Sequence, residues 1–224
     1  ATTSTSGGGA APTMSGDASK SKKKVGSPAM FIPFMFAFVA LGALLCGRAA
    51  QALDGAGASQ KARALGDEGF VYVAMFVIGF TMQAMSLVAG FARAAANIDR
   101  PDQFVYETRG GADGRATVLL AADGARGEFN RAQRAFFNTL ESLAVFVANV
   151  LLVGRVAPRC ALLLAVLFAV GRMMYAVGYR SSPSGRGLGF LVGAVVAGNM
   201  ASGGALAVGL VALDVPNVGA VVGL

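Results

Sequence analysis

The sequence contains no histidine and only two cysteines, Cys46 and Cys160. Both cysteines lie in or beside apolar runs, and no cluster of potential metal ligands surrounds either of them. Zinc and haem sites depend largely on His and Cys side chains, so we expect no metal site of these kinds. A framework of disulfide bonds is excluded as well, because it needs several cysteines at regular spacings.

Charged side chains are also scarce. Asp, Glu, Lys and Arg make up 14% of the residues, hydrophobic residues make up 55%, and the mean hydropathy is +0.61. This composition is too apolar for a soluble domain and favours the lipid bilayer as solvent. The formal net charge of +7 is then interpreted as a determinant of orientation and of contact with lipid headgroups. We therefore expect an integral membrane protein that does not bind nucleic acid.

Long apolar runs divide the chain into candidate membrane spans, since a hydrocarbon core of about 30 Å needs about 20 apolar residues per helix. The sequence predicts an all-α protein with a basic disordered tail or targeting remnant at 1–27, a first transmembrane helix at 28–47, a linker at 48–68, a four-helix bundle at 69–213 and a C-terminal tail at 214–224. The bundle contains a long loop at 94–128, and we interpret its glycine-rich stretch 110–127 as flexible. Five spans are expected in total.

The loop charges support five spans rather than four. With five spans, the basic run at 20–24 and the arginines of the loop 94–128 lie on the same side of the membrane. This asymmetry agrees with the positive-inside rule, which counts Lys and Arg in short loops. The amino terminus and the long loop are therefore expected on the cytosolic or equivalent side.

Polar residues cluster at one end of two predicted spans. Arg134, Asn138 and Glu141 are spaced four and three residues apart and share one face of a helix. Arg172, Tyr175 and Tyr179, spaced three and four residues apart, likewise share one helix face near the end of the next span, and Arg186 comes just after it. A charged side chain inside a membrane costs roughly 3 kcal/mol on insertion scales, so such residues usually line a cavity or pair with one another. Two interpretations are open: a ligand pocket, or ion pairs and hydrogen bonds that hold the bundle together.

Two segments resemble the MAPEG family of membrane proteins in eicosanoid and glutathione metabolism. The first is FNRAQRAFFNTLE (Phe129 to Glu141), where the family's second helix opens with an Arg, an Asn four residues on and a Glu three further. The second is GRMMYAVGYRSSPSGRGLG (Gly171 to Gly189), which is similar to the exit of its third helix and the turn that follows. EGFVYV at Glu68 to Val73 also resembles the start of the first helix in the microsomal glutathione S-transferase 3 type.

The resemblance implies a four-helix bundle that assembles as a homotrimer, with glutathione as co-substrate between subunits. Such proteins conjugate glutathione to lipophilic electrophiles, reduce lipid hydroperoxides or make eicosanoids. By position, the resemblance assigns two roles. Glutathione binding is assigned to Arg93, Arg134, Asn138, Glu141, Arg172 and Tyr175. Catalysis, by activation of the thiolate, is assigned to Tyr179 and Arg186. It also suggests the endoplasmic reticulum, while the Ser-rich tail leaves a mitochondrial or plastid membrane open.

Three departures from the family support an alternative function. Phe136 stands where family members usually carry His or Gln, the loop 94–128 is longer than theirs, and the span 28–47 is an addition. The alternative is a structural or accessory subunit of a larger organellar membrane complex, with other membrane subunits as partners. An enzyme is expected to keep its charged residues around an open pocket, whereas a scaffold subunit would pair them internally.

Overall fold

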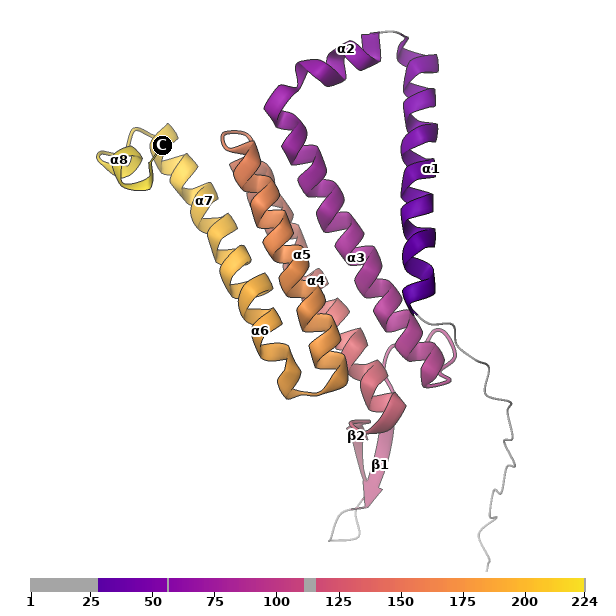
Figure 1. Cartoon of the computed structure of the whole chain (residues 1–224). Coiled ribbons are helices and arrows are strands. Elements are labelled where there is room, and N and C mark those ends of the chain that lie inside the picture. The colour runs from indigo at the N-terminus through magenta and orange to yellow at the C-terminus, as the bar shows by residue number, and fades with distance from the viewer. Residues whose placement is uncertain (1–27, 56, 111–115, 224) are drawn as a thin grey trace, which may run out of the picture.

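A computed structural model describes residues 28–55, 57–110 and 116–223, and most of them are helical. The elements, in chain order, are α1 (Pro28–Asp54), α2 (Gly57–Ala64), η1 (Gly66–Glu68), α3 (Gly69–Ala95), β1 (Tyr106–Gly110), β2 (Ala116–Leu120), α4 (Gly124–Gly154), α5 (Pro158–Ser181), η2 (Ser184–Arg186), α6 (Gly187–Phe190), the π-helical η3 (Leu191–Val196), α7 (Ala197–Ala212) and α8 (Val218–Val222). Helices α3, α4, α5 and α7 form the bundle, and α1 leans away from it (Figure 1).

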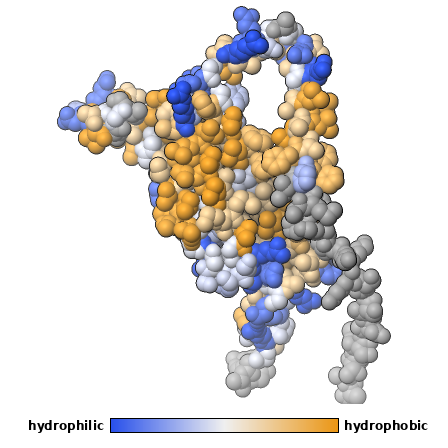
Figure 2. Space-filling view, viewed as in Figure 1, coloured by the Kyte–Doolittle hydropathy of each residue, from blue (hydrophilic) through white to orange (hydrophobic). Residues whose placement is uncertain are grey.

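Within these described ranges, five helices are long and apolar enough to cross a membrane. They are Pro33–Asp54, Gly66–Ala95, Gly124–Gly154, Pro158–Ser181 and Ser184–Ala212. Figure 2 shows an apolar surface over the bundle between polar ends, as expected where lipid replaces water around the helices. The expected all-α membrane architecture with five spans is therefore confirmed.

The boundaries differ from the expected ones in the connecting segments. Helix α1 continues to Asp54, because the segment after Gly47 is rich in the helix-favouring residues Ala, Gln and Leu, and it ends at Gly55 with φ of +68°. The rest of the expected linker 48–68 contains α2 and η1, and the expected C-terminal tail contains α8. The predicted tail 1–27 lies outside the described residues.

The interpretation of 110–127 as a flexible loop was wrong for much of its length. Strand β2 occupies Ala116–Leu120 and pairs antiparallel with β1, with Thr108 opposite Val118, and α4 already begins at Gly124. The run ATVLL contains β-branched and aliphatic residues that suit a strand. The prediction missed this strand because it was based on the many glycines on either side of the run. This hairpin projects from the end of the bundle at which α4 begins and α5 ends (Figure 1).

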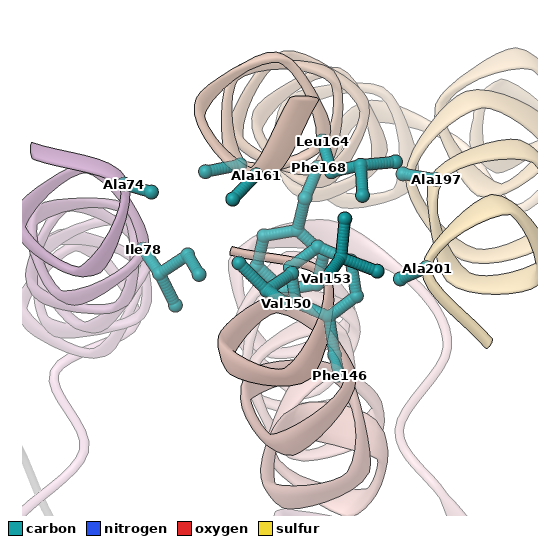
Figure 3. Packing of buried hydrophobic residues seen from close by; sticks show 11 residues of the cluster. Ala74, Ile78, Phe146, Val150, Val153, Ala161, Leu164, Phe168, Ala197 and Ala201 are labelled. Carbon is teal, nitrogen blue, oxygen red and sulfur yellow. The ribbon is translucent and has the colours of Figure 1, made fainter. Parts of the chain in front are cut away.

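The bundle core lies between α3, α4, α5 and α7. Phe146 of α4 stacks on Phe168 of α5 with ring centroids 4.2 Å apart, and small residues from α3 and α7 close around this pair (Figure 3). Ala74, Ala161 and Ala197 are fully buried there. Small side chains let the helix backbones approach closely, which is the main source of stability between helices surrounded by lipid.

The first span stands apart from this core. Its apolar stretch contributes no buried residue, and its contact with the bundle includes Phe36 against Phe80, with ring centroids 5.3 Å apart. Between α1, α3 and α5 lies an apolar cavity of about 760 Å³, which Met35, Phe80 and Met173 help to line. The added helix therefore borders a lipid-accessible groove rather than completing the bundle.

Candidate functional site

Arg134, Asn138 and Glu141 line one pocket on the surface of α4, as their helical spacing predicts. The pocket has a volume of about 280 Å³ and is also lined by Gln103, Phe104 and Phe137. Arg134 and Glu141 are both exposed. In the part of the chain that the structure describes, neither of them takes part in an ion pair. The two opposite charges are therefore available to a ligand.

A series of contacts connects this pocket with the following span. The side-chain amide of Asn138 donates a hydrogen bond from Nδ2 to the Tyr175 hydroxyl at 2.7 Å. Tyr175 is buried and stacks on Tyr179 with ring centroids 5.6 Å apart. The guanidinium of Arg186 lies over the Tyr179 ring, with Cζ 5.4 Å from the centroid. Six of the predicted site residues thus belong to one connected group: Arg186, Tyr179, Tyr175, Asn138 and, through the pocket, Arg134 and Glu141.

The ends of α4 and α5 are tied together close to this group. Arg131 donates from Nε to the Arg180 carbonyl at 3.0 Å, and Arg180 forms an ion pair with Glu128 at 3.4 Å. These contacts hold the beginning of α4 against the end of α5. The two polar segments consequently lie at the same end of the bundle, as the sequence predicted.

Arg172 does not line the pocket that contains Arg134. Its side chain is 3% exposed, donates from Nη2 to the Ser142 hydroxyl at 2.8 Å and lies over the Phe168 ring. It borders a second groove of about 320 Å³, between α4, α5 and the last span, that also contains Asn149 and Ser202. The Nε atom of Arg172 is buried without a hydrogen-bond partner among the described residues. Its predicted role in glutathione binding stays a prediction.

Arg93 is also absent from the pocket lining. Its guanidinium stacks on Phe129, with Cζ 4.8 Å from the ring centroid, and donates a hydrogen bond to the Asp99 carbonyl at 3.0 Å. These contacts attach the end of α3 to the start of α4. Within the described chain, Arg93 supports the pocket end of the bundle without reaching the residues that line the pocket.

Sequence reasoning missed two pocket residues, Gln103 and Phe104. Both come from the segment between α3 and β1, and the Phe104 ring lies 6.0 Å from the Phe137 ring. They were missed because they lie 31 and 30 residues before Arg134, in a segment without helical periodicity. A usable signal existed in Asn130: a polar residue near the start of an apolar helix needs a hydrogen-bond partner, and here that partner is Val105, in the segment between α3 and β1.

Phe136, one of the two phenylalanines between Arg134 and Asn138, packs inward. Its side chain contacts the buried cluster of Met85, Ala135, Tyr175 and Ala176. The ring of Phe136 lies 6.1 Å from that of Phe137. The α4 surface of the pocket therefore has three polar side chains and one aromatic one.

The chemistry of this pocket suits a zwitterionic or anionic ligand with several polar groups. Arg134 offers a planar set of donors that can bind a carboxylate through two hydrogen bonds, and Glu141 can accept from an ammonium group. Asn138 contributes an amide whose orientation is set by Tyr175. Phe104 and Phe137 give the pocket an apolar wall beside these polar groups, which a lipophilic molecule can contact.

Fold and site together define a polytopic helical membrane protein with a polar pocket at one end of its bundle. Residues 71–206 of the chain match the MAPEG family, and this match covers more than half of the sequence. The chain therefore belongs to the MAPEG family, which includes glutathione transferases and related proteins. No curated protein matches the sequence. The added helix α1 and the C-terminal α8 lie outside the matched region.

Proposed function

We propose that this protein is a membrane-bound glutathione transferase or peroxidase, of the microsomal glutathione S-transferase 3 type. One observation carries the proposal: Arg134 and Glu141 are exposed around one pocket and are not paired with other described residues. A scaffold that used these charges for stability would be expected to pair them, because unpaired charges in a membrane protein are costly. Their availability favours a ligand with both a carboxylate and an ammonium group.

Glutathione has the functional groups that this pocket complements. It carries two carboxylates, one ammonium group, two peptide bonds and a thiol. In the proposed complex Arg134 binds a carboxylate, Glu141 binds the ammonium group, and Asn138 binds a peptide group of the tripeptide. Arg172, Tyr175 and Arg93 are proposed to complete or support the binding site from the neighbouring elements.

Arg186 and Tyr179 are the proposed catalytic residues. A guanidinium beside the glutathione thiol stabilises the thiolate and lowers the pKa of the thiol, and the thiolate is the nucleophile. Tyr179 positions the Arg186 guanidinium through the contact between the ring and Cζ at 5.4 Å. The thiolate sulfur then attacks an electrophilic carbon of a lipophilic substrate and displaces its leaving group. With a lipid hydroperoxide it attacks the terminal oxygen, which breaks the O–O bond and gives the lipid alcohol and glutathione sulfenic acid. A second glutathione thiol then attacks the sulfenic sulfur and gives glutathione disulfide and water.

The pocket volume bears on the proposed assembly. At about 280 Å³ the pocket is slightly smaller than the 300–1,000 Å³ or so that is usual for ligand pockets. A neighbouring subunit against this face of α4 would enlarge and close it. We therefore propose a homotrimer in the endoplasmic reticulum membrane, with glutathione bound where two subunits meet.

Calorimetric titration of the detergent-solubilised protein with glutathione tests this function. We expect micromolar to millimolar binding that is lost in Arg134→Ala and partly kept in Arg134→Lys, which retains the charge but not the planar donors. Arg155→Ala is the matched control, because Arg155 is an exposed arginine at the opposite end of α4. A well-folded sample without glutathione binding would contradict the proposal.

The added helix α1 favours a second candidate function, that of an accessory subunit in a larger organellar membrane complex. Phe34 and Phe38 are 60% and 71% exposed, and the helix lies outside the region matched to the family. An exposed aromatic surface of this kind can pack against another membrane subunit as well as against lipid. Copurification of a stoichiometric partner with a chain that does not bind glutathione would support this candidate.

A further inference from the structure

We propose that the segment between α3 and β1 is part of the ligand site, with Gln103 as a ligand-binding residue and Asn130 as the residue that positions it. This inference rests on the proposed function and extends it. The segment lies in the long connection between α3, which ends at Ala95, and α4, which begins at Gly124. It adds a binding group to the pocket that α4 alone does not supply.

Gln103 lies where it can meet a ligand of the α4 pocket. It lines the same pocket as Arg134, Asn138 and Glu141, and its side chain is exposed. Its amide makes no hydrogen bond to any other described residue, so both its donor and its acceptor are available. Phe104, the next residue, fills the rest of this wall with its ring against Phe137 at 6.0 Å.

The composition of the pocket explains why a further polar group is needed. From α4, only Arg134, Asn138 and Glu141 present polar side chains to it, and Phe137 presents a ring. A tripeptide with two carboxylates, an ammonium group and two peptide bonds has more hydrogen-bonding groups than these three residues can pair. Gln103 can donate to a carboxylate or pair with a peptide group, which an aromatic side chain cannot.

Asn130 holds this segment in place through three hydrogen bonds. Its Oδ1 accepts from the Val105 amide at 2.9 Å, and its Nδ2 donates to the carbonyls of Val105 and Ala121, both at 2.8 Å. The Ala121 amide also donates to the Val105 carbonyl at 2.9 Å, which closes the base of the hairpin. Asn130 is 2% exposed, so water does not compete for these bonds.

This clamp acts close to the proposed ligand-binding residue. Val105 is two residues after Gln103, and Asn130 is one helical turn before Arg134 on the same helix. One buried side chain thus sets the position of the inserted segment relative to the charged residues of α4. A loop fixed in this way loses less conformational entropy when the ligand binds, and this increases affinity.

The main test is calorimetric titration of Gln103→Ala with glutathione, in the full-length protein in detergent. We expect about three- to tenfold weaker binding than for the wild type, the effect of losing one hydrogen bond to a polar or charged ligand group. Gln60→Ala is the matched control, because Gln60 is an exposed glutamine of α2 at the opposite end of the bundle. Gln103→Ala with wild-type affinity overturns the proposal.

Charge substitutions at the same position sharpen this test. Glutathione carries a net negative charge, so Gln103→Lys is expected to bind it more tightly than Gln103→Ala, and Gln103→Glu less tightly. Thr108→Lys and Thr108→Glu serve as controls on the exposed hairpin. At physiological salt, charges more than about 8 Å from the ligand are largely screened. Equal effects at the two positions would mean that Gln103 does not contact the ligand and would overturn the assignment.

Asn130 is tested by a double-mutant cycle. Asn130→Asp keeps the size of the side chain but replaces the Nδ2 donor, so it removes two of the three hydrogen bonds. We expect faster hydrogen exchange at the Ala121 amide, which donates to the Val105 carbonyl at the base of the hairpin, and weaker glutathione binding. In the double variant with Gln103→Ala we expect no further loss of affinity, because Asn130 acts through Gln103. Additive losses, or faster exchange with unchanged binding, overturn the positioning role.

The outcomes for the proposed function and for this inference are separate. Absence of binding to the wild type contradicts the glutathione function itself and the inference with it. Binding that requires Arg134 but does not change in any Gln103 variant supports the glutathione function and overturns only the inference.

Discussion

Arg134 and Arg172 show how differently two arginines of neighbouring helices can be used. Arg134 is exposed at a pocket and has no ion pair within the described chain, whereas Arg172 is buried and held by Ser142 and Phe168. Their sequence contexts predicted the same role for both. Only the first arrangement leaves the guanidinium free to bind a carboxylate in this pocket.

The role of Glu141 can be tested by removing its charge without changing its shape. Glu141→Gln is expected to weaken glutathione binding about tenfold, because a hydrogen bond between two charged groups contributes roughly 1.5–3 kcal/mol. An analogue of glutathione without the amino group is expected to bind the variant and the wild type equally well. Titration calorimetry of both ligands measures the difference, with Glu68→Gln as a control at the other end of the bundle.

Equal loss for both ligands would contradict the assignment of the ammonium group to Glu141. It would instead indicate that the carboxylate supports the pocket as a whole. The comparison of the two ligands therefore separates a direct contact from an effect on the structure of the pocket.

At the level of elements, the contact between α5 and the last span depends on glycine. A Cβ added at Gly171 would lie 2.2 Å from the Gly193 amide nitrogen, and one at Gly189 would lie 2.1 Å from the Tyr175 nitrogen. Such distances exclude any side chain at these positions. The last span thus packs directly against the backbone that carries Arg172 and Tyr175, and its π-helical stretch η3 lies at this contact.

This packing predicts a clear difference between two glycine substitutions. Gly171→Ala is expected to force α5 and η3 apart and to reduce stability by about 1–3 kcal/mol, the usual range for overpacking. Gly198→Ala is expected to be neutral or slightly stabilising, because a Cβ there meets no atom within 4 Å. Thermal unfolding in detergent measures both variants. Equal melting temperatures for the two would contradict the packing described for Gly171.

The hairpin shows which elements could not be predicted from the sequence. A two-stranded hairpin is rarely stable alone, so its strands have little local signal, and a tertiary contact at Asn130 anchors its base. Arg109 adds a hydrogen bond to Glu107 at 2.7 Å within β1, and this contact with Glu107 raises the pKa of the Arg109 guanidinium. The long helices could be predicted because each carries its own apolar run.

On the scale of the whole molecule, the first span is separable from the bundle. The described core clusters contain residues from α3, α4, α5 and the last span, with none from α1. Met35 and Phe36 of α1 line the apolar cavity of about 760 Å³. An element that buries so little of its own surface contributes little to the stability of the remaining fold.

Deletion of residues 1–55 is accordingly expected to leave the bundle folded and its glutathione binding unchanged. Thermal unfolding and titration calorimetry of the shortened protein measure both properties, and native mass spectrometry shows whether the proposed trimer is kept. Phe80→Ala in the full-length protein is the matched control, because it removes the contact between Phe36 of α1 and Phe80 of α3 but keeps α1 in the chain. Loss of binding on deletion would instead show that α1 supports the pocket.

The sequence by itself determined the number of spans, the helical class, the family and the shared face of Arg134, Asn138 and Glu141, because apolar length and helical periodicity are local properties of the chain. Only the tertiary structure decided which of the candidate residues meet. It placed Gln103 in the pocket, Arg172 in a separate groove and Arg93 against Phe129. These outcomes depend on contacts between segments that are distant in the sequence, and no local pattern records which partner a side chain finds.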